Sequence, residues 1–358
     1  MVISRLVKGI KNQDWLLVVI MVMAFLNFGG IVSAQNAQNL KPDILIITTG
    51  GTIASRAKAS MIKGPALVQA VPNLLEYANI SVEEFSVIGS SRMTPSHWLN
   101  LAKRINTLFS QNNGLDGIVI THGTDTLEET AYFLNLTLKS DKPVVITGSM
   151  KSSDEVSADG PANLINAVRV AGSNTSTGQG VLVALNENIT AARDVWKTDN
   201  RRVDTFEGAS VGHIGIVDPD GVRFYHQIIQ PHTNQSEFDI VGVTSLPNIP
   251  ILTDYTGFDE KLVEVFSNQK IEGLVVRTFA GGRMSAGMQR GLKKFQKSGI
   301  PVVVTSRVPL GRIVQAPDYG FMTIVSNGLQ DNKARILLML AILKTTNLEE
   351  IQRIFDTY

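Results

Sequence analysis

The chain alternates short, continuous apolar runs with longer segments whose apolar residues recur at helical spacing. Within residues 127–138 the apolar side chains follow one another at intervals of three and four, and residues 164–171 repeat this spacing, which is typical of helices with one buried face. Thr126 and Glu129 form a capping-box pattern before the first of these helices. The apolar runs predict strands buried on both faces of a parallel sheet; they are Ile44–Thr48, Gly117–Thr121, Pro143–Thr147 and Val181–Leu185.

A polar, proline-marked stretch over residues 230–250 separates this series from a second, smaller one. Prolines in such a polar segment indicate a connection between domains. Before it, residues 216–222 contain Asp-Pro-Asp-Gly between apolar residues and predict a hairpin turn. The second series contains predicted strands at Leu274–Arg277 and Pro301–Thr305 and predicted helices at Asp259–Gln269, Ser285–Lys297 and Lys333–Lys344.

These patterns predict two α/β domains. The N-terminal domain is expected over residues 41–232, an interdomain linker over 233–250, and a smaller C-terminal domain over 251–358. Open α/β sheets bind ligands at the carboxyl ends of their strands. Candidate functional residues are therefore expected where the apolar runs end.

The first 34 residues have the three-part layout of a secretory signal peptide. Arg5, Lys8 and Lys11 precede a mainly apolar run, and a small-residue exit ends at Ala34. The run is shorter than the roughly 20 residues that span a bilayer comfortably. We predict cleavage after Ala34 and a periplasmic or secreted protein; the alternative is an uncleaved anchor. No other segment is apolar enough to cross a membrane, so the mature protein is expected to be free of it.

Composition narrows the chemistry further. The chain has 33 Lys+Arg against 32 Asp+Glu, a formal net charge of +1, which argues against nucleic acid as a partner because phosphate binding needs a basic surface. It has no cysteine, so a thiol nucleophile, a disulfide and a cysteine-bearing zinc site are excluded.

Two threonine-rich strand ends could carry catalysis. The first run ends in two glycines followed by Thr52, and these glycines allow a sharp turn and close backbone approach to a ligand. The second ends in His122-Gly123-Thr124-Asp125 before a predicted helix, whose N-terminal amides favour a carboxylate or an oxyanion. Taken alone, the first motif is more readily explained as a plain turn and the second as a helix cap. Their occurrence at two strand ends of one domain favours a functional site.

A threonine hydroxyl is a weak nucleophile and needs a base or a polarising neighbour. His122 is interpreted as a structural residue more readily than as a base. The chain contains no H-E-x-x-H pair and no P-loop. A buried lysine can act as a base, and Lys197 is the candidate, with a solvated lysine as the alternative.

Several segments resemble the bacterial L-asparaginase family from about residue 41 to the C-terminus, most of all its exported branch, which includes glutaminase-asparaginases. The resemblance implies a larger N-terminal domain with a flavodoxin-like parallel sheet and a smaller C-terminal α/β domain. It also implies a homotetramer, active sites shared between subunits, and no metal or cofactor. The matching segments are Thr49–Ala54, Ile120–Ala131, Lys142–Met150, Ser157–Leu164, Arg193–Val195 and Ser306–Pro309.

The resemblance also assigns roles. Thr52 matches the family's nucleophile, while Thr124, Asp125 and Lys197 match its second hydroxyl-centred triad, in which Lys197 polarises the Thr124 hydroxyl and Asp125 holds the lysine and the substrate amino group. Ser90 matches the serine that binds the substrate carboxylate. Gly51, Ser91 and Gly123 complete the expected substrate-binding set, with Ser91 standing where many relatives have Gln or Glu. Backbone amides near Thr124 and in the Gly50-Gly51 turn are expected oxyanion donors.

The sequence departs from the family's pattern in three segments. Residues 53–71 are shorter than the family's lid and contain no tyrosine, and residues 310–317 contain no acidic residue. Phe279–Met284 replaces an asparagine-rich loop, and its Arg283 either binds a carboxylate at the site or is solvated.

The leading hypothesis is therefore an exported amidohydrolase that converts L-asparagine to L-aspartate and ammonia through a threonine acyl-enzyme. One alternative is a glutaminase-asparaginase that also uses L-glutamine. A second is a catalytically impaired relative that binds an amino acid or peptide, and a third is hydrolysis of an unrelated amide.

Overall fold

A computed structural model describes residues 41–54, 63–267 and 269–358 of the chain. The predicted signal peptide lies outside these residues. Pro42–Tyr358 form one compact unit. Across the described residues, every helix is too short or too polar to traverse a bilayer.

The N-terminal part of this unit is built on an eight-stranded sheet with the order β10-β9-β6-β5-β4-β3-β1-β2. Strands β2, β1, β3, β4 and β5 are parallel, and β6, β9 and β10 continue the sheet in antiparallel pairs. The strands are β1 (Asp43–Gly50), β2 (Asn79–Ile88), β3 (Gly117–Thr121), β4 (Val144–Thr147), β5 (Val181–Leu185), β6 (Asn188–Ala191), β9 (Gly215–Asp218) and β10 (Gly221–Phe224).

Successive residues of the central strands point into two different cores. In β1, Leu45 and Ile47 join one apolar cluster, whereas Ile44 and Ile46 join another. This is the period-two alternation of a strand, and it explains why the runs are apolar throughout. The predicted strands and the 216–222 hairpin, in which Asp218 pairs with Gly221, are confirmed.

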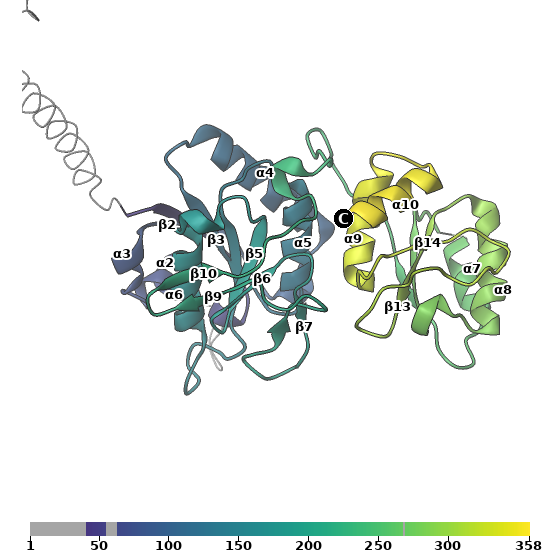
Figure 1. Ribbon diagram of the computed structural model, residues 1–358, viewed down its shortest axis with the longest axis horizontal. Helices are drawn as coiled ribbons and strands as arrows, with labels where there is room; N and C mark the ends of the chain where they lie inside the picture. Colours follow the sequence, from purple (N-terminus) through teal and green to yellow (C-terminus); the bar gives the residue numbers. More distant parts are fainter. Residues whose placement is uncertain (1–40, 55–62, 268) are drawn as a thin grey trace, which may run out of the picture. The chain divides into compact units, whose positions relative to one another are not determined.

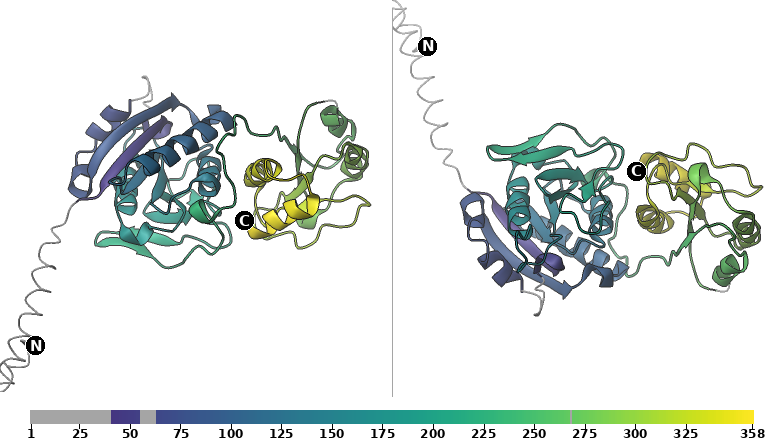
Figure 2. Two further views of the ribbon diagram at one scale, coloured as in Figure 1. Left: turned by 90° about the horizontal axis from the view of Figure 1, so that it is seen from above. Right: turned by 90° about the horizontal axis from the view of Figure 1, so that it is seen from below.

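Helices cover both faces of this sheet (Figure 2). Helices α4 and α5 contribute to the first cluster, and α2, α3 and α6 to the second. Strand β2 and helix α4 were not predicted from the sequence. The helices are α2 (Gly64–Gln69), α3 (Leu74–Tyr77), α4 (Pro95–Gln111), α5 (Leu127–Thr137) and α6 (Gly160–Ala171), with short 3-10 turns η2 (Thr52–Ala54), η3 (Ser90–Arg92) and η4 (Asn174–Ser176).

The C-terminal part repeats this logic on a four-stranded parallel sheet, β11-β12-β13-β14, with α9 and α10 beside β13 and β14 (yellow in Figure 1). Alternate residues of β12 face α7 and α8 or face α9 and α10. The elements are η5 (Thr233–Gln235), β11 (Ile251–Thr253), α7 (Lys261–Ser267), β12 (Leu274–Thr278), η6 (Ala280–Gly282), α8 (Ala286–Phe295), η7 (Gln296–Ser298), β13 (Val302–Ser306), β14 (Ile324–Val325), α9 (Asp331–Ile342) and α10 (Leu348–Thr357).

The parallel strands run in the order β2-β1-β3-β4-β5, which is the flavodoxin-like order. The predicted α/β class with a larger parallel sheet and a smaller C-terminal sheet is confirmed. In this order the chain reverses direction across the sheet between β1 and β3, where ligands bind beyond the carboxyl ends of the strands. Thr52 follows β1 and Thr124 follows β3, and Thr48 pairs with Thr121 at these ends.

Candidate active site

The turn after β1 is built so closely against the loop after β3 that only glycine fits. Gly50 and Gly51 have φ of +102° and +84°, which side chains rarely adopt. A Cβ on Gly51 would lie 2.3 Å from the Cα and N of Gly123. The Thr49 hydroxyl donates to the carbonyl of Thr121 at 2.9 Å and ties the two loops together. Thr52 is therefore presented at the start of η2, next to the second threonine-rich loop.

The second loop brings together the three predicted triad residues. Thr124 is buried, and Lys197 Nζ donates to its Oγ1 at 2.9 Å. Lys197 Nζ also lies 3.6 Å from Asp125 Oδ1, with 21% of the lysine side chain and 62% of the aspartate side chain exposed. Lys197 is therefore not a freely solvated lysine, and Asp125 remains open to a ligand.

Lys197 comes from a separate element. It ends β7 (Trp196–Lys197), which forms a two-stranded sheet with β8 (Phe206–Glu207), where Lys197 lies opposite Phe206. Its own backbone N–H donates to Glu128 Oε2 at 2.7 Å. Glu128 was not singled out from the sequence, although it stands four residues after Thr124 on the first turn of α5.

Ser90 connects the end of β2 to the same loop. It is buried, its hydroxyl accepts the Asp125 N–H at 3.1 Å, and its carbonyl accepts the Thr126 hydroxyl at 2.9 Å. A Cβ on Gly123 would lie 2.6 Å from Ser90 Oγ, so this glycine is required by close packing. Ser91, by contrast, is exposed.

The predicted capping box is wrong. Thr126 is the N-cap residue of α5, but its side chain makes no cap; its hydroxyl donates to the Ser90 carbonyl instead. Glu129 turns toward α9 instead, and burial raises the pKa of its carboxyl to about 7, against the attraction of Arg335.

His122 is structural, as interpreted from the sequence. It is fully buried; its Nδ1 lies 2.8 Å from the Gly123 carbonyl, and its Nε2 lies 3.0 Å from the Thr130 hydroxyl. That hydroxyl accepts the Trp98 indole N–H at 3.0 Å, so its own proton points to Nε2 and the Nδ1 proton points to Gly123. Burial lowers the pKa of His122 to about 4, which keeps the ring neutral.

Two expected oxyanion donors are already engaged. The Gly51 N–H donates to the Ile88 carbonyl at 3.1 Å, and the Asp125 N–H donates to Ser90 Oγ. A tight turn and a helix start often expose their amides, but here the end of β2 supplies the Ile88 carbonyl and the η3 turn supplies the Ser90 hydroxyl.

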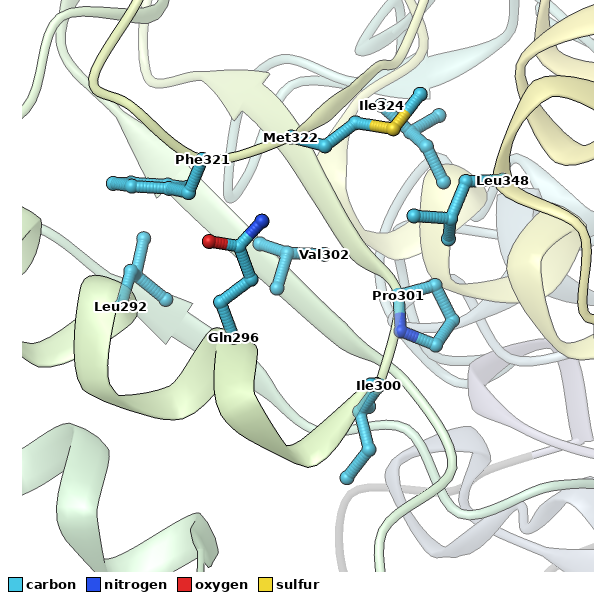
Figure 3. Close-up of a pocket in the computed structure, with 10 residues that line it drawn as sticks. Leu292, Gln296, Ile300, Pro301, Val302, Phe321, Met322, Ile324 and Leu348 are labelled. Carbon is cyan, nitrogen blue, oxygen red and sulfur yellow. The ribbon is translucent and has the colours of Figure 1, made fainter.

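Among the segments that depart from the family's pattern, residues 55–62 lie outside the described part of the chain. Arg283 is exposed and its Nη1 donates to the Ala280 carbonyl of its own turn at 3.2 Å, which supports the solvated alternative. An apolar pocket in the C-terminal part contains none of the predicted site residues (Figure 3). Within the described ranges, no three His, Asp or Glu side chains converge as metal ligands would.

The chain matches two family models and several named relatives. The family described as "Asparaginase, N-terminal" matches residues 43–230, and "Glutaminase/Asparaginase C-terminal domain" matches residues 248–355. "Probable L-asparaginase periplasmic" of Haemophilus influenzae is 40% identical, covering 92% of this chain and 97% of that protein. "Glutaminase-asparaginase" of Pseudomonas fluorescens is 36% identical, covering 88% and 90%.

A solved structure agrees with these matches. "Probable Cytoplasmic L-asparaginase" from Campylobacter jejuni has a TM-score of 0.85 and 42% identity, covering 89% of this chain and 100% of that one. Fold and matches together define a two-domain α/β amidohydrolase. The chain belongs to the asparaginase family, and the resemblance found in the sequence is confirmed.

Proposed function

We propose that this protein hydrolyses L-asparagine to L-aspartate and ammonia through a threonine acyl-enzyme. The observation that carries the proposal is the 2.9 Å hydrogen bond from Lys197 Nζ to the buried Thr124 hydroxyl beside Asp125. A lysine aimed at a hydroxyl, at the switch point of the sheet, is an arrangement that can move a proton. The names of the relatives support asparagine as the substrate.

In the proposed reaction, Thr52 Oγ attacks the side-chain amide carbon and forms an ester while the carbon–nitrogen bond breaks. The hydroxyl proton of Thr52 leaves with the amide nitrogen, which departs as ammonia. Thr124 and Lys197 relay protons during this exchange, and Asp125 holds the ammonium group of the lysine. Water then hydrolyses the ester, releasing aspartate and restoring the Thr52 hydroxyl. An amide carbon is a poor electrophile, so the developing oxyanion also needs donors, which must be amides other than those of Gly51 and Asp125.

We assign the α-carboxylate of the substrate to the Ser90 hydroxyl and its α-ammonium group to Asp125. Gly51, Ser91 and Gly123 surround the remaining space. Ser91 is short and exposed, and one methylene in a pocket is worth only about 1–3 kcal/mol. L-glutamine is therefore a second candidate substrate, which the glutaminase-asparaginase relative favours.

The direct test is ammonia release by the purified protein from L-asparagine, L-glutamine and a panel of other amides. We expect release from L-asparagine, abolished in Thr52→Ala and restored in part by Thr52→Ser, which keeps the hydroxyl. Binding of L-asparagine without ammonia release would instead identify an impaired, binding relative. Release only from other amides would reassign the substrate.

We further propose that the protein is exported after cleavage at Ala34 and acts as a homotetramer. The basic, apolar and small-residue regions of residues 1–34 support export, and the names of the relatives include both a periplasmic and a cytoplasmic protein. N-terminal sequencing of protein from the natural host tests cleavage. Light scattering tests the assembly.

A further inference from the structure

The proposed catalytic lysine sits on a strand too short to fix it. Strand β7 has two residues and forms a two-stranded sheet with the two-residue β8, and an isolated pair of strands is marginally stable at best. Lys197 Nζ must nevertheless stay within hydrogen-bond distance of Thr124 to move a proton. Other groups must therefore hold the segment that carries it.

A buried lysine from the C-terminal part binds the backbone just before Lys197. Lys333, on α9, is only 2% exposed. Its Nζ donates to the carbonyl of Arg193 at 2.8 Å and to the carbonyl of Val195, which lie four and two residues before Lys197. A buried ammonium group is costly unless it is hydrogen-bonded, so these two bonds fix the backbone as well as the lysine.

The residue beside it on α9 holds Lys197 by a second route. Asn332 Nδ2 donates to Glu128 Oε1 at 2.6 Å, and the other carboxylate oxygen of Glu128 accepts the Lys197 N–H at 2.7 Å. The Asn332 Oδ1 in turn accepts the Lys333 N–H at 2.8 Å. One turn of α9 therefore reaches the backbone of Lys197 through a carboxylate and the backbone just before it through an ammonium group.

We propose that Lys333 and Asn332 are positioning residues, which hold Lys197 in place against Thr124 through the 193–195 backbone and through Glu128. Neither residue contacts the proposed reacting atoms. The inference rests on the proposed role of Lys197, and it makes the first turn of α9 part of the catalytic apparatus of the N-terminal part. A merely structural role for Lys333 is the alternative, because any buried lysine that bonds two carbonyls stabilises the fold.

The chain offers a matched control for that alternative. Lys142 Nζ also donates to two backbone carbonyls, those of Asn113 at 3.1 Å and Leu115 at 2.7 Å. It lies just before β4, at the amino ends of the strands, opposite the site. Lys142→Met and Lys333→Met therefore remove the same kind of interaction at two distances from Lys197.

We expect Lys333→Met to lower kcat for asparagine about tenfold to a hundredfold, the effect of displacing a catalytic group by roughly 1 Å. Its KM should change little, because Ser90 and Asp125 are untouched. Lys333→Arg, which keeps the charge and the donors, should recover part of kcat. Lys142→Met should lower the melting temperature yet leave kcat unchanged. Equal kcat values in Lys142→Met and Lys333→Met would overturn the proposal.

Asn332→Leu keeps the proposal testable if Lys333→Met fails to fold. It has a similar shape, lacks the donor to Glu128, and is expected to lower kcat several-fold with KM unchanged; an unaltered kcat would remove Asn332 from the positioning set.

Hydrogen exchange measured by mass spectrometry on residues 193–197 gives a readout independent of turnover. Lys333→Met, or Asn332→Leu in its place, should exchange faster there than Lys142→Met, and equal exchange contradicts the proposal. If Lys333→Met exchanges faster but the unmodified protein releases no ammonia from asparagine, the positioning role stands and the proposed function is overturned.

Discussion

Replacing Lys197 with methionine tests the proposed proton relay most sharply. Methionine keeps an unbranched apolar stem but cannot exchange a proton. Loss of a positioned acid–base group costs about 10²–10⁴-fold in rate, which corresponds to about 3–5 kcal/mol of transition-state stabilisation at about 1.4 kcal/mol per factor of ten.

The same change should hardly affect folding. The ion pair with Asp125 is long, at 3.6 Å, and 62% of the aspartate side chain is exposed. Pairs with such exposure contribute about 0–1 kcal/mol. A large loss of kcat with a nearly unchanged free energy of unfolding therefore separates chemistry from stability. Lys197→Arg is the matched control, because it keeps the positive charge but cannot give up its proton, and it should be nearly as inactive.

A double-mutant cycle shows whether the lysine acts through the Thr124 hydroxyl. Thr124→Val removes that hydroxyl with little change in shape and should also lower kcat by orders of magnitude. If the two residues form one relay, the double variant is no slower than the slower single variant, because residues that act as a unit are not additive. Multiplied losses, or a Lys197→Met variant within tenfold of the unmodified enzyme, would refute this reasoning. Ammonia release measures kcat, and urea unfolding measures the free energy of unfolding.

Three further predictions concern the packing around the site. Gly51→Ala places a side chain at a positive φ and 2.3 Å from Gly123, so it should cost at least about 2 kcal/mol of stability and most of the activity. Gly178→Ala, with φ of +74° in open space, is the control. Equal effects of the two substitutions on urea unfolding and on kcat would be evidence against the close approach of Gly51 to Gly123. The pKa of His122 falls from 6.5 to about 4, so the unfolded state binds its proton first and stability should fall by about 3 kcal/mol as pH drops from 6.5 to 4; urea melts of His122→Gln should lack this slope. The pKa of Glu129 rises from 4.5 to about 7, so stability should decline as pH rises through this range, and Glu129→Gln should be the more stable protein at pH 8 but not at pH 4.5.

The sheet and the site loops could be predicted from the sequence because local signals encode them. Ile44–Ile47 are apolar throughout because both faces of β1 are covered, and Gly50 and Gly51 mark the turn that only glycine permits. Thr52, Thr124 and Lys197 were identified through these signals and the family resemblance. Helix α9 was expected over 333–344 and is observed over Asp331–Ile342.

The features that could not be predicted from the sequence depend on contacts between distant segments. Thr126 has the local pattern of a capping residue, but its hydroxyl donates to the carbonyl of Ser90, 36 residues earlier. The Gly51 N–H donates to the Ile88 carbonyl of β2, a strand that was not predicted because its polar and apolar residues follow no clear pattern. Glu128 and Asn332 are 204 residues apart, and no periodicity or motif signals their hydrogen bond.

The assignment of the Thr52 oxygen as the nucleophile is best tested by mass spectrometry of enzyme quenched during asparagine turnover. We expect an aspartyl adduct on the peptide that contains Thr52, absent in Thr52→Ala and longer-lived in Lys197→Met. An adduct on Thr124 instead, or turnover by Thr52→Ala at the rate of the unmodified enzyme, would contradict it.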